Sequence, residues 1–141
     1  MSALGDLIRA SWSGWADDPL EATVFGTTDA EAIARHVDAL ACEHLGARIT
    51  GALGYHASVG CTALVRFDDG RGVAIKVHQP GCSARFLGAV VAVQRHVHDA
   101  GLPAPRPLAG PAPIGPTLAT ADALLPDPGP ADDLDHLDGV R

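Results

Sequence analysis

Two short apolar runs with strand periodicity, residues 61–67 and 72–78, lie on either side of the turn sequence Asp68-Asp69-Gly70. An Asp-Gly pair between two such runs is a strong signal for a β-hairpin, because glycine adopts the positive φ that a tight turn needs. The hairpin requires an antiparallel sheet, and a third strand is expected over about residues 49–53. This segment constrains the fold more than any other.

Helical patterns lie on both sides of the predicted sheet. Over residues 28–45 apolar side chains recur at helical spacing, with Thr28 and Glu31 placed as a capping box and Gly46 as a stop signal. Ser83 can cap a second helix that runs to about residue 98. The apolar side chains expected on the buried side of this helix are Phe86, Leu87, Val90, Val91, Val93 and Val97.

The two ends of the chain are less regular. Residues 1–27 include a short amphipathic stretch, but Pro19 and the two aspartates before it interrupt the helical pattern, so we expect a loosely attached leader. Residues 101–130 hold most of the prolines, which excludes long helices and central strands and permits short edge strands near residues 106–109 and 117–120. The predicted fold class is α+β: a small antiparallel sheet with one packed helix, preceded by an N-terminal helix.

The charge and composition of the chain exclude several classes of partner. Seventeen carboxylates against ten lysine and arginine side chains give a net charge of −7, so nucleic acid and anionic membrane surfaces are not expected partners. No apolar run approaches the roughly 18 residues of a membrane-spanning helix, and no signal peptide is recognisable, so we expect a cytoplasmic protein. The cysteines form no paired motif and are expected to be buried side chains without a metal; they are Cys42, Cys61 and Cys82.

Lys76 is the only lysine in the chain, whereas arginine supplies every other fixed cation. Because side chains alternate along a strand, Ala74, Lys76 and His78 are expected on one face and the intervening apolar residues on the other. Upstream, three glycines are predicted to form a turn where the backbone can approach a ligand closely: Gly51, Gly54 and Gly60. A glycine-bearing turn followed by a strand with Val-Ala-Ile-Lys is the order in which kinases bind ATP phosphates.

Four segments resemble the N-terminal lobe of the aminoglycoside phosphotransferase family, small-molecule kinases with a protein-kinase-like fold. They are the turn GYHASVG, the strand VAIKVH, the helix FLGAVVAVQRHVHDAG and the connection GLPAPRPL, within about residues 48–125. The resemblance implies that Lys76 contacts nucleotide phosphates, that Ala74 covers the adenine, and that residues 121–125 form the hinge. The implied ATP-binding residues are Gly54, Ser58, Val59, Gly60, Ala74 and Lys76. A lysine that simply faces solvent is the alternative.

The chain departs from the kinase pattern in two places. The kinase lysine usually pairs with a glutamate on the following helix, but this chain has no glutamate after Glu43. Gln94 could form a hydrogen bond there without supplying a charge, or could be an ordinary core or surface glutamine. The sequence His136-Leu137-Asp138 mimics part of the kinase catalytic loop, but the asparagine expected five residues after the aspartate would fall beyond Arg141, so we assign it no catalytic role.

The sequence therefore predicts the nucleotide-binding lobe of a small-molecule phosphotransferase. The family reaction transfers the γ-phosphate of ATP to a hydroxyl with the help of Mg²⁺, and we expect this chain to be inactive alone, with neither catalytic nor metal-binding residues. The expected organisation is a leader over residues 1–27, the lobe over residues 28–125, and the start of a missing C-terminal lobe, or a tail, over residues 126–141. Self-association through an exposed lobe interface is also expected. The alternative is a non-catalytic α+β domain that binds nucleotide or another protein.

Overall fold

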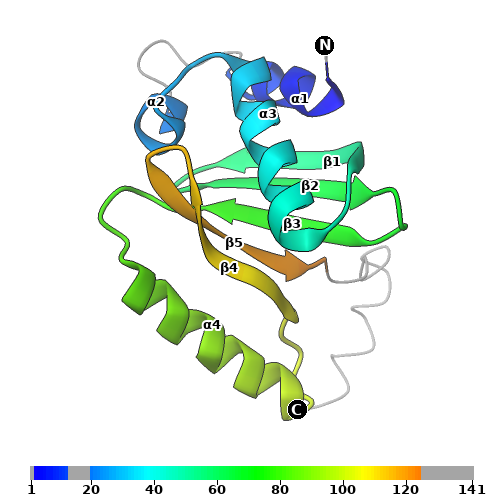
Figure 1. The fold of residues 1–141 in the computed structure, drawn as a ribbon, viewed down its shortest axis with the longest axis vertical. Helices are drawn as coiled ribbons and strands as arrows, with labels where there is room; N and C mark the ends of the chain where they lie inside the picture. Colours follow the sequence, from blue (N-terminus) through cyan, green and yellow to red (C-terminus); the bar gives the residue numbers. More distant parts are fainter. Residues whose placement is uncertain (1, 13–19, 125–141) are drawn as a thin grey trace, which may run out of the picture.

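The computed structural model describes residues 2–12 and 20–124 (Figure 1). These residues form an α+β fold with a single five-stranded antiparallel sheet, which confirms the predicted fold class. The helices are α1 (Ala3–Ser11), α2 (Leu20–Phe25), α3 (Ala30–Leu40), its π-helical extension η1 (Ala41–Leu45) and α4 (Ala84–Asp99). The strands are β1 (Ile49–Ala57), β2 (Cys61–Phe67), β3 (Gly72–Val77), β4 (Pro107–Ile114) and β5 (Thr117–Ala123).

The sheet has the strand order β1-β2-β3-β5-β4. The predicted hairpin joins β2 to β3, with Val65 opposite Val73 and a φ of 88° at Gly70. The C-terminal strands are longer than expected, and β5 is not an edge strand, because it pairs with β3 on one side and β4 on the other. The edge position belongs to β4, which contains Pro107, Pro111 and Pro113; a proline lacks the N–H that an inner strand would use.

The hydrophobic core lies between one face of the sheet and the N-terminal helices. Val73, Ile75 and Val77 of β3 are at most 2% exposed and pack in the same cluster as apolar residues of α1, α2 and α3. The expectation of a loosely attached leader is therefore wrong for the described part of residues 1–27. In that part Ile8 and three other apolar side chains are buried, which are Leu4, Val24 and Phe25.

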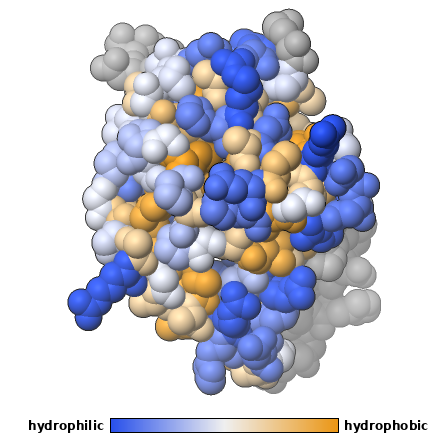
Figure 2. Space-filling view, in the orientation of Figure 1, coloured by the Kyte–Doolittle hydropathy of each residue, from blue (hydrophilic) through white to orange (hydrophobic). Residues whose placement is uncertain are grey.

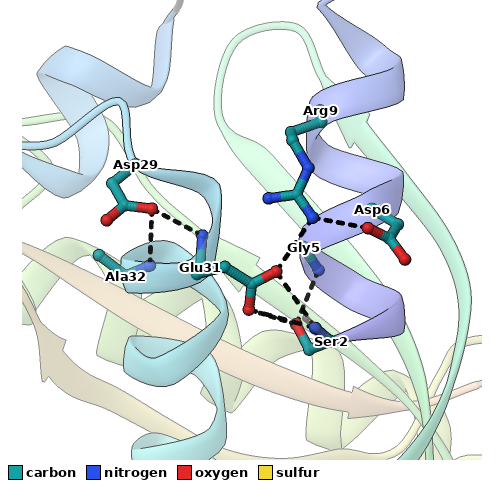
Figure 3. A network of polar contacts seen from close by, with 7 residues as sticks. All are labelled: Ser2, Gly5, Asp6, Arg9, Asp29, Glu31 and Ala32. Carbon is teal, nitrogen blue, oxygen red and sulfur yellow. Dashed lines mark hydrogen bonds and ion pairs between the residues drawn. The ribbon is translucent and has the colours of Figure 1, made fainter.

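A polar network joins the first turns of α1 and α3 (Figure 3). The Glu31 carboxylate accepts a hydrogen bond from the backbone N–H of Ser2 at 3.1 Å and another from the Ser2 hydroxyl at 3.1 Å. It also forms an ion pair with Arg9. Glu31 is thus not part of a capping box with Thr28. The N-cap of α3 is Asp29, whose Oδ1 accepts from the backbone N–H groups of Glu31 and Ala32. Gly46 ends this helical segment with a φ of 64°, as predicted.

Helix α4 packs mainly along the edge strand β4, beside the sheet rather than across its face (Figure 1). Its predicted N-cap is confirmed, because the Ser83 hydroxyl accepts from the N–H of Phe86 at 3.0 Å. The predicted buried side is wrong for three of its six members, and Val91 and Val97 are only partly buried. Leu87 is 2% exposed, whereas Phe86, Val90 and Val93 are 58%, 44% and 64% exposed. A helix that lies against one edge strand covers only a narrow stripe of its own surface.

Candidate functional site

The face of the sheet opposite the core carries Lys76. Along β3 the core residues alternate with Ala74 and Lys76, so the predicted separation of the two faces is confirmed. The Lys76 side chain is 43% exposed, and Thr62 on β2 and Thr120 on β5 are its partners in the neighbouring strands. Lys76 therefore lies on an inner strand, with its side chain partly open to solvent.

The ammonium group of Lys76 forms an ion pair with Asp122 of β5. The distance from Nζ to Oδ2 is 2.8 Å, and Asp122 is only 3% exposed. Asp122 is the partner of Ala74 across the two strands, two residues from the position opposite Lys76, so the pair is a diagonal contact within the sheet. A buried carboxylate needs a positive partner and hydrogen bonds to compensate for its lost hydration.

Gln94 of α4 supplies the second contact of this carboxylate. Its amide nitrogen Nε2 donates to Oδ1 of Asp122 at 2.9 Å and to the backbone oxygen of Pro105 at 2.8 Å. Two acceptors at one atom require the amide N–H groups there, which assigns the orientation of the amide. The sequence pattern left the role of Gln94 open; the structure places it against the carboxylate that pairs with Lys76.

His78 follows β3 on the same side as Lys76. Its Nε2 lies 2.8 Å from the hydroxyl oxygen of Thr120, which is 7% exposed. Burial lowers the pKa of His78 below its ordinary value, the positive charge of Lys76 lowers it further, and Asp122 opposes both effects. The imidazole is therefore predominantly uncharged near neutral pH, and Lys76 is the fixed cation of this group of residues.

The predicted glycine turn is shorter than expected. Strand β1 continues to Ala57, so Gly51 and Gly54 lie within a strand and not in the turn. Gly54 is opposite Leu64 of β2. The turn consists of residues 58–60, where the N–H of Ser58 donates to the carbonyl oxygen of Gly60 at 3.0 Å. Val59, at the tip of the turn, is 70% exposed.

Gly60 is required by the neighbouring strand. A Cβ at this position would lie 2.5 Å from the backbone oxygen of Val77, closer than real Cβ contacts. The turn thus packs directly on the end of β3, near Lys76 and His78. The sequence predicted a close approach to a ligand at Gly60; in the structure the group that lies close to Gly60 is the backbone oxygen of Val77.

The predictions for Ala74 and for the hinge over residues 121–125 can also be compared with the structure. Ala74, predicted to cover the adenine, is on the lysine face but only 8% exposed. The predicted hinge at residues 121–125 is partly wrong, because Ala121 to Ala123 belong to β5 and are hydrogen-bonded into the sheet. Leu125, like the tail over residues 126–141 and its His136-Leu137-Asp138 sequence, lies outside the described residues.

Sequence reasoning missed Asp122 and Thr120. A signal was available: β5 reads Thr-Leu-Ala-Thr-Ala-Asp-Ala, in which Thr120 and Asp122 are two apart and so share a face. Within residues 2–12 and 20–124 no cluster of His, Cys, Asp and Glu could hold a metal ion. The expectation that the cysteines are buried is confirmed for Cys61 and wrong for Cys42, which is exposed, while Cys82 is intermediate.

No family model, curated protein or solved structure matches this chain. Among the described residues, no helix combines the length and the apolar character needed to cross a membrane.

Proposed function

We propose that this chain is a nucleotide-binding lobe in which Lys76 contacts the phosphates of ATP. The observation that carries the proposal is the half-exposed side chain of the lone lysine, whose ammonium group is paired on an inner strand with a carboxylate that is almost completely buried. A surface lysine would need no such partner. Because the Lys76 side chain is partly open to solvent, its ammonium group can bind a phosphate oxygen as a compact point charge.

The arrangement of the strands supports the same proposal. The turn over residues 58–60 joins β1 to β2, and β2 leads through the hairpin to β3 and Lys76. This order, and the position of helix α4 after the lysine strand, agree with the kinase arrangement of a glycine-bearing turn, a lysine strand and a helix. The family reaction would transfer the γ-phosphate of ATP to a hydroxyl of a small molecule. In that reaction Mg²⁺ neutralises phosphate charge, and the role of Lys76 is to bind and orient the phosphates.

The test is a calorimetric titration with Mg·ATP of the unmodified chain, Lys76→Ala and Arg35→Ala. Arg35 is a matched control, because it is an exposed cation on α3, across the sheet from Lys76. Loss of a charge-assisted contact of about 1.5–3 kcal/mol should weaken binding about ten- to hundredfold in Lys76→Ala only. Absence of Mg·ATP binding by the unmodified chain, or equal affinities of all three proteins, would refute the proposal.

A second candidate function, binding of another protein, is favoured by the exposed apolar side chains of α4. Phe86, Val90 and Val93 recur at helical spacing and are all exposed, although apolar and polar residues alternate over the face drawn in Figure 2. If this stripe mediates self-association, light scattering should show a mass that rises with concentration and falls to the monomer in Val93→Glu. A monomer at every concentration would argue against it. We also propose a cytoplasmic location, which the three free cysteines support because disulfides are rare in that compartment.

A further inference from the structure

Lys76 and Asp122 belong to strands that are hydrogen-bonded neighbours. β3 and β5 pair over five residues on each strand, with Ala74 opposite Asp122 and Lys76 opposite Thr120. The separation of the two charged side chains is therefore set by the backbone ladder of the sheet. It does not depend on how a helix packs against that sheet.

Gln94 contacts the ion pair as a hydrogen-bond donor, and helix α4 does not supply the carboxylate of that pair. Gln94 is neutral and donates one N–H group to Asp122 and the other to the carbonyl oxygen of Pro105. Both acceptors lie outside α4, on β5 and in the segment that precedes β4. Most of the remaining α4 surface is exposed, and this partly buried amide is a polar attachment of the helix to the rest of the fold.

We propose that Asp122 is the fixed counter-ion that positions Lys76, and that α4 is anchored to this ion pair through Gln94 without controlling it. What this means for phosphate binding rests on the proposed nucleotide-binding function. In protein kinases the carboxylate is on the helix, so movement of the helix forms or breaks the pair. Here both charges are in the sheet. Lys76 is thus held ready for a phosphate whatever the position of α4, and the site lacks that form of regulation.

The lone lysine permits a direct test. A water-soluble amine-reactive ester can acylate only Lys76 and the α-amino group of the chain, and the α-amino group serves as an internal reference. The rate at Lys76 is measured by mass spectrometry, without nucleotide, for the unmodified chain, Asp122→Asn and Gln94→Met. We expect Asp122→Asn to raise the rate about fivefold, because the ammonium group loses its partner, and Gln94→Met to leave it unchanged.

Amide hydrogen exchange of α4 is the measurement that should respond to Gln94→Met. Gln94→Met should speed exchange of the α4 amides, since the helix loses its attachment to Asp122 and Pro105. A Lys76 acylation rate that is unchanged in Asp122→Asn, or raised as much by Gln94→Met, would overturn the inference. If Asp122→Asn does not fold, the single lysine Nζ signal in an NMR spectrum of the unmodified chain and of Gln94→Met replaces it. Ion-paired ammonium protons visible in both support the inference, and their absence from either overturns it.

The same reagent distinguishes this inference from the proposed function. Mg·ATP should protect Lys76 of the unmodified chain from acylation. If Mg·ATP gives no protection while Asp122→Asn still raises the rate in its absence, the nucleotide proposal fails and the role of Asp122 as counter-ion stands. If Mg·ATP protects Lys76 and Asp122→Asn has no effect on the acylation rate, the nucleotide proposal stands and the role of Asp122 as counter-ion fails.

Discussion

Removal of one hydroxyl, in Tyr55→Phe, should destabilise the attachment of α2 to the sheet. The Tyr55 hydroxyl donates to Oε1 of Glu21 at 2.6 Å, and Glu21 is 1% exposed although it belongs to a helix of only six residues. The substitution keeps the ring and its packing. It leaves a buried carboxyl group of Glu21 without this donor, so the effect reports the hydrogen bond.

The magnitude depends on the burial of Glu21. A hydrogen bond to a charged group contributes about 1.5–3 kcal/mol, and a buried acceptor left unpaired costs about 1–3 kcal/mol. We therefore expect Tyr55→Phe to lower the free energy of unfolding by about 2–3 kcal/mol. For a domain of this size that corresponds to a fall of roughly 5–10 °C in Tm.

The assay is urea denaturation followed by circular dichroism for the unmodified chain, Tyr55→Phe, Glu21→Gln and the double variant. Because the two groups are in contact, the losses in the single variants should not add in the double variant. A Tyr55→Phe protein within about 0.5 kcal/mol of the unmodified chain would refute the reasoning, because that is the range of surface substitutions without a specific role.

Tyr55 is also the only tyrosine, so its ionisation can be followed by ultraviolet absorbance. Burial, followed by hydrogen bonds with Cys61 and Glu21, raises the pKa of Tyr55 far above its ordinary value of 10. A raised pKa in the folded state means that this stability is present below pH 10 and is lost as the pH rises above it. Burial likewise raises the pKa of Cys61, from 9 to about 11, with the same sign. Tyrosinate should therefore appear only as the protein unfolds in alkali; titration near pH 10 in the folded chain would contradict the structure.

Two other features of the lysine face carry predictions. Gly60→Ala would place a Cβ against the backbone oxygen of Val77 and should cost ~1–3 kcal/mol in urea denaturation, whereas the control Gly88→Ala, in open space on α4, should stabilise the protein by ~0.5–1 kcal/mol. Equal effects of the two substitutions would contradict the packing of the turn on β3. The lowered pKa of His78 in the folded state predicts that stability is present above pH 6.5 and is lost as the pH falls below it; His78→Gln should flatten this acid limb of a stability profile, and an unchanged limb would assign it to other groups.

Local signals in the sequence were sufficient for most of the elements. The Asp-Gly turn fixed where β2 meets β3, and Ser83 and Gly46 marked helix ends, because each depends on the backbone conformation or hydrogen bonding of a few neighbouring residues. Local pattern was less reliable where two polar candidates competed. Asp29 caps α3 in place of Thr28, since Glu31 binds Ser2 at a distance of 29 residues in the chain.

The sequence by itself determined the fold class, the hairpin and the face of β3 on which Lys76 lies, because these depend on side-chain periodicity and turn chemistry. Only the tertiary structure decided what that lysine contacts. Asp122 is 46 residues away along the chain, and it meets Lys76 because β5 inserts between β3 and β4. The exposed apolar stripe of α4 was likewise decided by tertiary structure: periodicity indicates a helix with an apolar side, but the element it packs against determines how much of that side is covered.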